Sequence, residues 1–257
     1  MPVMEPVILL PGLLCDSALW QFQLTALEEF ATPIVADLGG AVSIAALARS
    51  VLASAPPRFA LAGLSMGGYV AFEIWRQAPE RVTRLALLDT SARPDTDEMR
   101  ARRQDLIQLA ELGRFKGVTP RLLPLLLHPD QLAGPLAAIV TDMAERVGQA
   151  AFIRQETAIL NRIDSVPTLA TVTVPSLVLC GDSDRLTPPA LAEEIAAGIP
   201  GAELVIVAGS GHLSTLERPG SGQSRAHRLA RALKPTGLQE GGAARPSSGR
   251  GRRGRSG

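Results

Sequence analysis

Short apolar segments alternate with segments of helical periodicity along most of the chain, and this alternation constrains the fold more than any other feature. The apolar segments are almost continuous runs of Val, Ile, Leu and Ala, as expected for strands buried on both faces of a parallel sheet. Four candidate helices lie at residues 17–29, 43–54, 66–77 and 188–198, among six candidate strands at residues 6–10, 33–36, 58–63, 82–88, 174–180 and 203–207. The pattern predicts an α/β fold with a doubly wound, mostly parallel sheet.

The alternation stops between Pro94 and about Val172, where apolar residues recur at helical spacing. A long excursion between two strands of such a sheet usually lies over the edge where the strands end, which is also where these folds bind ligands. We therefore expect a helical lid at about residues 94–172. Most of the apolar residues at 122–127 are expected to pack against the core.

Length and composition predict one soluble domain, residues 1–219, that contains this insertion. A chain of 257 residues with 46% hydrophobic content can bury one substantial core. No apolar run approaches the ~18 residues that a membrane span needs, and residues 1–6 lack the basic start of a signal peptide, so we expect a cytoplasmic location. Cys15 and Cys180 belong to no C-x-x-C pair, and we interpret both as buried thiols.

The candidate strand at residues 58–63 runs into Gly-Leu-Ser-Met-Gly at 63–67 and then directly into a helical pattern. Strand, G-x-S-x-G and helix in this order are typical of a sharp turn that exposes a serine hydroxyl. Glycine on either side of the serine removes side chains that would collide in such a turn. The order indicates that Ser65 is a nucleophile, with the free N–H groups of the following helix beside the site of developing negative charge.

A serine hydroxyl needs a base to remove its proton, and histidine is the usual base near neutral pH. Of the three histidines, His128 lies in the expected lid and His227 lies in a basic C-terminal segment. His212 instead follows the last candidate strand, in Gly-Ser-Gly-His, so its loop is expected at the same edge of the sheet as Ser65. His212 is the predicted base.

A carboxylate that orients this histidine should follow a strand, between the serine and the histidine in chain order. Asp182 and Asp184 both come after the strand that ends at Cys180, and Asp89 comes after the strand at residues 82–88. Acids in turns often bond only to their own backbone. Sequence spacing leaves all three candidates open.

These motifs and their order resemble the α/β-hydrolase superfamily, in particular its small lidded esterases, over residues 5–219. The resemblance implies an α/β-hydrolase fold in which Ser65, Asp184 and His212 form a catalytic triad. It favours Asp184 over Asp182 because Asp184 has the family's spacing from the preceding glycine and the following proline.

The same resemblance implies an oxyanion hole made by the backbone N–H groups of Leu13 and Met66, with Gly63 and Gly67 as the glycines of the turn. Many family members carry His-Gly where this chain has Pro-Gly at 11–12. Backbone donors need no particular side chain, so we expect the oxyanion hole despite this difference.

A serine in this motif implies an acyl-enzyme mechanism and disfavours the dehalogenases and epoxide hydrolases of the superfamily, which use an aspartate there. The sequence has no phosphate-binding loop, dinucleotide fingerprint or metal-ligand cluster, so no cofactor and no metal are expected. The expected activity is that of a carboxylesterase acting on a small uncharged acyl substrate. An enol-lactonase or carbon–carbon bond hydrolase is the alternative within the class, and a non-catalytic ligand-binding protein is the alternative outside it.

Residues 220–257 differ sharply from the rest of the chain. They contain eight arginines and Lys234 against the single acid Glu240, and no aromatic residue that could stack on bases, so no nucleic-acid partner is expected. The capping-box pattern at 214–217 and Pro219 indicate a closing helix, yet a Gly/Arg/Ser-rich composition typical of disorder follows.

We therefore expect residues 220–257 to lie outside the core and to leave an exposed apolar strip near residues 205–207. A shifted reading frame near Pro219 would explain such a segment. A genuine regulatory or membrane-surface tail is the alternative, because four apolar residues from Ala226 to Leu233 fall at helical spacing. The sequence does not indicate an oligomeric state.

Overall fold

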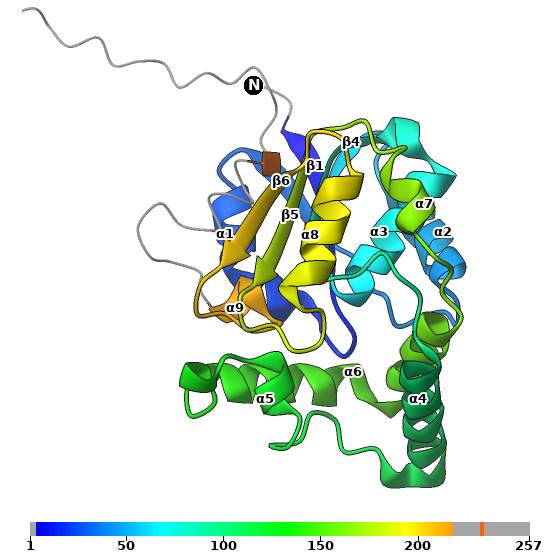
Figure 1. Ribbon diagram of the computed structural model, residues 1–257, viewed down its shortest axis with the longest axis vertical. Coiled ribbons are helices and arrows are strands. Elements are labelled where there is room, and N and C mark those ends of the chain that lie inside the picture. The colour runs from blue at the N-terminus through cyan, green and yellow to red at the C-terminus, as the bar shows by residue number, and fades with distance from the viewer. Residues whose placement is uncertain (1–3, 218–231, 234–257) are drawn as a thin grey trace, which may run out of the picture.

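A six-stranded sheet forms the centre of the computed structural model, which describes residues 4–217 and 232–233 (Figure 1). The strand order is β2-β1-β3-β4-β5-β6, and every neighbouring pair is parallel. The strands are β1 Glu5–Leu10, β2 Ala31–Val35, β3 Phe59–Leu64, β4 Val82–Leu88, β5 Ser176–Gly181 and β6 Glu203–Val207. Each candidate strand is present with slightly shifted ends, and the predicted fold class is confirmed.

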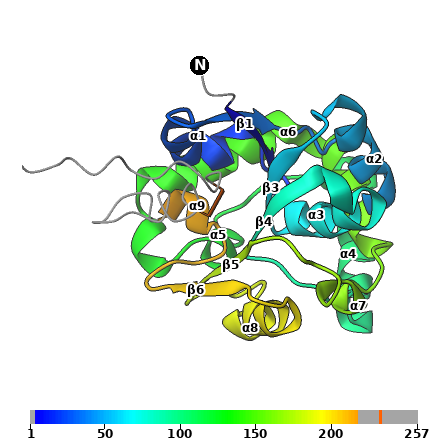
Figure 2. The same ribbon diagram turned by 90° about the horizontal axis from the view of Figure 1, so that it is seen from above.

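Helices cover both faces of the sheet, as Figure 2 shows. One face carries the short helix η1 (Ser17–Trp20), α1 (Gln21–Leu27) and α9 (Ser214–Glu217). The other face carries α2 (Ile44–Ser54), α3 (Met66–Gln77) and α8 (Pro189–Gly198), with the single turn η2 (Pro79–Arg81) after α3. The predicted helix at 17–29 is thus a short 3₁₀ turn followed by a shorter α-helix.

Side chains of the strands alternate between two buried clusters, one under each helical layer. In β1, Val7 and Leu9 belong to the cluster beneath α1, whereas Ile8 and Leu10 belong to the cluster beneath α2 and α3. Because both faces are buried, the strands read as continuous apolar runs and lack an alternating pattern.

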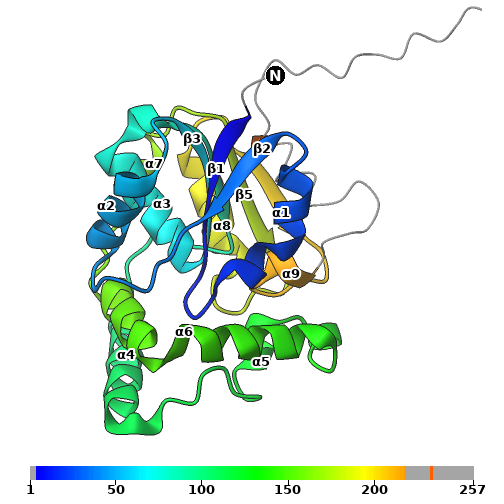
Figure 3. The same cartoon turned by 180° about the vertical axis from the view of Figure 1, so that it is seen from behind.

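Most of the chain between β4 and β5 forms the lid, which lies across the end of the sheet where the strands finish (Figures 1 and 3). Its helices are α4 Asp97–Leu109, η3 Ala110–Arg114, α5 Leu123–Leu126, η4 Pro129–Gln131 and α6 Pro135–Leu160. Gly148 breaks the helical backbone of α6 with φ 74° and ψ 173°. α6 therefore consists of two helical parts joined by a kink at this glycine.

The helical lid ends earlier than the predicted residue 172. The last helix of the insertion, α7 (Val166–Leu169), packs against α8 and not over the strand ends: a Cβ added at Gly198 would lie 2.6 Å from the side chain of Leu169. Leu169 belongs to the buried cluster beneath α2 and α3. Residues after Leu160 are thus part of the core layer.

The predicted exposed strip on β6 is present at alternate residues only. Leu204 and Ile206 are 38% and 40% exposed, whereas Val205 and Val207 are buried. Beyond residue 217 the structure describes only Ala232 and Leu233, and Leu233 is fully buried in the cluster beneath α1. The expectation of a segment outside the core does not hold at Leu233, and its remainder falls outside the described residues.

Among the described residues, no helix combines the length and the apolar character needed to cross a membrane.

Candidate active site

Ser65 occupies a strained turn between β3 and α3. Its backbone has φ 54° and ψ −114°, and a positive φ is unusual for a residue with a side chain. A Cβ added at Gly63 would lie 2.3 Å from the carbonyl oxygen of Gly67, and one added at Gly67 would lie 2.0 Å from that of Leu10. Both glycines of the motif are therefore sterically required.

Hydrogen bonds from the neighbouring strand hold this turn. The N–H of Ser65 donates to the carbonyl of Leu88 at 3.0 Å, and the carbonyl of Ser65 accepts from Thr90 Oγ1 at 2.8 Å. Thr90 also requires a third glycine, because a Cβ added at Gly68 would lie 2.3 Å from its Oγ1. No local sequence pattern indicates Thr90, because its role depends on the pairing of β3 with β4.

His212 connects Ser65 to Asp184 in one hydrogen-bonded chain. Its Nε2 lies 2.9 Å from Ser65 Oγ, and its Nδ1 lies 2.9 Å from Asp184 Oδ2. Both His212 and Asp184 are buried. Thr187 Oγ1 donates to Asp184 Oδ2 at 2.7 Å, and its backbone N–H donates to Asp184 Oδ1 at 2.9 Å. The carboxylate is thus oriented toward the imidazole by donors from its own loop.

Asp182, the competing candidate, points to a different part of the same loops. Its carboxylate accepts the backbone N–H of Gly209 at 2.9 Å and that of Ser210 at 3.3 Å. These residues precede His212, so Asp182 fixes the start of the His212 loop, residues 209–213, without contacting the imidazole. Asp182 and Asp184 thus have different roles although both follow the same strand.

Asp89, the third candidate, is fully buried at the end of β4 and has a positive φ of 45°. Its Oδ1 accepts the N–H of Gly181 at 2.9 Å, and its Oδ2 accepts from both the hydroxyl and the N–H of Ser214. The carboxyl group therefore joins the end of β5 to the segment just after His212. This bridging position is typical of a structural group beside the site.

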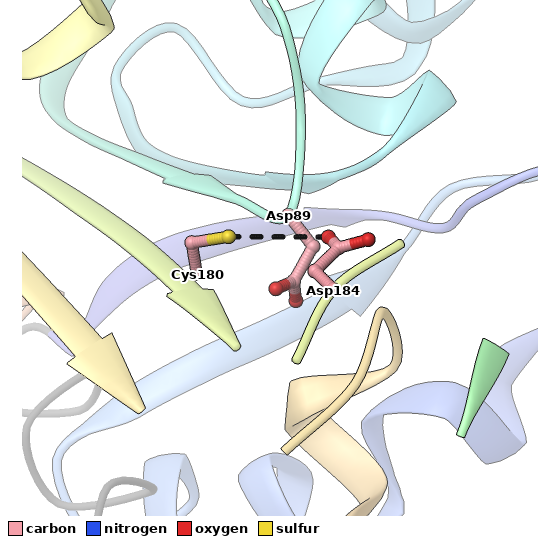
Figure 4. Close-up of side chains that lie close together, drawn as sticks. All are labelled: Asp89, Cys180 and Asp184. Carbon is pink, nitrogen blue, oxygen red and sulfur yellow. Dashed lines mark hydrogen bonds between the residues drawn. The ribbon is translucent and has the colours of Figure 1, made fainter. Parts of the chain in front are cut away.

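Asp89, Cys180 and Asp184 lie close together, as Figure 4 shows, with ligand atoms within 4.8 Å of one another. Such a cluster could in principle hold a cation. Protein donors already occupy both carboxyl groups, and Cys180 directs its thiol to Asp184 Oδ2 at 3.9 Å and to the carbonyl of Thr187 at 3.4 Å. Burial, followed by the nearby carboxylates, raises the pKa of the Cys180 thiol, which disfavours the thiolate that a metal requires. The donor set therefore fits a hydrogen-bonded network better than a metal site.

The charges around the imidazole favour an ion pair. Burial acts to lower the pKa of His212, but the Asp184 carboxylate and its hydrogen bond outweigh burial, so the pKa of His212 is raised. Burial also opposes ionisation of Asp184, yet His212 and the donors of Thr187 hold the pKa of Asp184 below its ordinary value. Burial, and then repulsion by Asp184, raise the pKa of Asp89. Asp184 is thus the carboxylate that stays charged beside His212.

The loop after β1 lies directly against Ser65. A Cβ added at Gly12 would lie 3.5 Å from Ser65 Cβ, and the loop closes through a hydrogen bond from Cys15 N–H to the Gly12 carbonyl at 3.2 Å. Leu14 adopts a positive φ of 58°. Leu13 lies at the middle of this turn and Met66 is the first residue of α3, where N–H groups lack helical partners. Both predicted donors therefore belong to segments beside the serine hydroxyl.

Two polar side chains for which no functional role is predicted from the sequence connect the site to the lid. Gln155 of α6 accepts the N–H of Leu14 at 3.1 Å. Glu217 accepts the N–H of Gly211 at 2.7 Å and the N–H of His128 at 2.6 Å. The capping-box pattern marked Glu217 only as a helix-start residue, and Gln155 carried no sequence signal.

Comparison with known proteins identifies a family and several related hydrolases. A family model described as the alpha/beta hydrolase family matches residues 7–222. A Variovorax paradoxus protein assigned as carbamate hydrolase RutD is 28% identical, over 81% of this chain and 85% of its own. A pimeloyl-acyl-carrier-protein methyl ester esterase from Neisseria meningitidis is 28% identical, over 66% of this chain and 67% of its own.

Among solved structures, a thermophilic esterase from Thermogutta terrifontis superposes with a TM-score of 0.77 and 26% identity, covering 89% of this chain and 88% of that chain. The predicted α/β-hydrolase fold and the prediction of a hydrolase are both confirmed. The chain belongs to the alpha/beta hydrolase family.

Proposed function

We propose that this hydrolase cleaves carboxylic esters through an acyl-enzyme intermediate, with Ser65 as the nucleophile. The observation that carries the proposal is the continuous chain of two 2.9 Å contacts from Ser65 Oγ through His212 to Asp184 Oδ2. Nucleophile, base and orienting acid within hydrogen-bond distance of one another are the requirement for acyl transfer by a serine.

In the first step, Ser65 Oγ attacks the ester carbonyl while His212 Nε2 takes the hydroxyl proton. Asp184 holds Nδ1–H and stabilises the imidazolium that forms. His212 then gives the proton to the leaving alcohol as the carbon–oxygen bond breaks. A water molecule, activated by the same imidazole, attacks the acyl-enzyme, and the acid product leaves with Ser65 restored.

The negative charge on the carbonyl oxygen would be stabilised by the backbone N–H groups of Leu13 and Met66. Support comes from the position of the loop at residues 12–15 against Ser65 and from the N-terminal end of α3, whose dipole favours an anion. Such preorganised donors act where the charge develops and need no rearrangement during the reaction.

A small uncharged acyl group is the substrate that the surroundings favour. The lid residues buried against the cluster beneath α1 are apolar, among them Leu127, Leu136, Val140 and Met143. Leu213, directly after His212, belongs to the same cluster. The names of the relatives, which include a methyl ester esterase, support an ester as the bond that is cleaved.

A panel of p-nitrophenyl esters with acyl chains of increasing length tests this proposal, with a lactone and a β-diketone as the competing substrate classes. We expect turnover of the short-chain esters, and loss of that turnover in Ser65→Ala. Turnover of the lactone or diketone alone would move the function to another hydrolase class, and no turnover of any substrate would favour a ligand-binding protein.

A further inference from the structure

Gln155 is a buried polar residue of the lid helix α6, with 2% of its surface exposed. Its Oε1 accepts the N–H of Leu14 at 3.1 Å, and its Nε2 donates to the carbonyl of Leu38 at 3.4 Å. The two bonds join α6 to the loop after β1 and to the loop after β2. A glutamine with both ends of its amide engaged is fixed in one orientation.

The loop that Gln155 contacts needs an external acceptor. Leu14 is buried and has φ 58°, a conformation that costs free energy for a residue other than glycine unless its surroundings hold it. Its N–H would be buried without a partner if the Gln155 oxygen were removed, because no other described residue accepts this hydrogen bond. The hydrogen bond therefore stabilises the strained turn itself.

We propose that Gln155 is a positioning residue for the oxyanion hole. The peptide between Leu13 and Leu14 is anchored by Gln155, and the preceding peptide carries the N–H of Leu13, which is the proposed donor to the reacting oxygen. Anchoring the first peptide restricts the direction of the second, since only the two dihedral angles of Leu13 separate them. The inference rests on the proposed function, because it assigns Gln155 to the oxyanion hole of that reaction.

Arg154 provides a matched control. It precedes Gln155 on α6, and its Nε donates to the carbonyl of Gly39 at 2.5 Å. This bond also ties the lid helix to the loop after β2, but it does not touch the loop at residues 12–15. Arg154→Met should therefore loosen the attachment of α6 without changing the oxyanion hole.

The test measures the rate at which a fluorophosphonate probe labels Ser65. In this reaction Ser65 Oγ bonds to phosphorus, fluoride leaves, the hydroxyl proton passes to His212, and the phosphoryl oxygen occupies the oxyanion hole. Loss of one direct donor to such an oxygen typically costs 10²- to 10³-fold, so we expect the indirect change Gln155→Met to slow labelling by about 10- to 100-fold. Arg154→Met should remain within about twofold of the parent.

A conservative variant separates positioning from general loss of structure. Gln155→Glu keeps an oxygen for the N–H of Leu14, and burial should keep the introduced carboxyl group protonated so that it can still donate to Leu38. We expect it to label at close to the parental rate, with all variants checked for folding by thermal melting. Equal labelling rates for Gln155→Met and Arg154→Met, or no recovery in Gln155→Glu, would overturn the inference. An unlabelled parent would instead contradict the proposed function together with this inference.

Discussion

Glu217 accepts the backbone N–H of His128 at 2.6 Å, so a residue of the segment after His212 is bonded directly to the lid. The other carboxylate oxygen accepts the N–H of Gly211 at 2.7 Å, immediately before the imidazole. A third bond, from Leu213 N–H to the Leu126 carbonyl at 3.1 Å, also connects the segment after His212 to the lid. The position of the lid and the position of His212 are therefore coupled through one buried carboxyl group.

Glu217→Gln should weaken both the fold and the site. An amide has one oxygen, so one of the two N–H groups would face an NH₂ group and lose its acceptor. Loss of a partner for a buried donor typically costs about 1–3 kcal/mol, which urea denaturation would measure. We also expect a fall in kcat/KM for p-nitrophenyl acetate, and unchanged stability would show that the bridge does not hold the lid.

The two acids of the loop after β5 should differ greatly in their effect on catalysis. Asp184→Asn removes the charge that stabilises the imidazolium and fixes its tautomer, and the equivalent change in a serine triad lowers kcat by about 10⁴-fold. Asp182→Asn leaves the imidazole untouched and should cost less than about tenfold. Steady-state kinetics of both variants on one ester provide the comparison, and a larger loss in Asp182→Asn would reassign the acid.

On its acidic side, kcat/KM should fall with a midpoint above the ordinary imidazole pKa of about 6.5. The ionised Asp184 raises the pKa of His212, and only the neutral imidazole can accept the proton of Ser65. Activity should therefore rise with pH as His212 loses its proton, and it should fall as the pH drops below the raised pKa. A midpoint below 6.5 in the parent would be inconsistent with a charged carboxylate beside the imidazole.

The local parts of the site could be predicted from the sequence because their geometry is determined by neighbouring residues. The glycines around Ser65 are required by contacts within one turn, and His212 follows a strand whose apolar run is unmistakable. The choice of Asp184 depended on the family's spacing as well, because Asp182 also follows the strand that precedes the acid.

The remaining parts depend on contacts between distant segments, which leave no local pattern. Gln155 and Leu14 are 141 residues apart, and Glu217 and His128 are 89 residues apart. The lid boundary was misplaced for the same reason, since helical spacing does not distinguish α7, which packs against α8, from the helices over the strand ends. The burial of Leu233 likewise depends on its contact with the distant cluster beneath α1.

Leu233→Ala tests whether the basic segment belongs to the fold. Leu233 is fully buried among apolar residues, and truncation of a buried leucine to alanine typically costs about 2–5 kcal/mol. We expect a clearly lower midpoint in urea denaturation, and the same direction of change for truncation after Pro219. If Leu233→Ala were as stable as the parent, residues 220–257 would lie outside the core, as their composition predicts.

Ser65→Ala is the most direct test of the proposed mechanism. The substitution removes one hydroxyl oxygen, so the fold should persist with a melting temperature close to that of the parent. Loss of a serine nucleophile from a triad typically lowers kcat by about 10⁶-fold, so we predict that ester hydrolysis falls to the background rate. Hydrolysis within about tenfold of the parental rate, by a correctly folded Ser65→Ala protein, would contradict the assignment of Ser65 as the nucleophile.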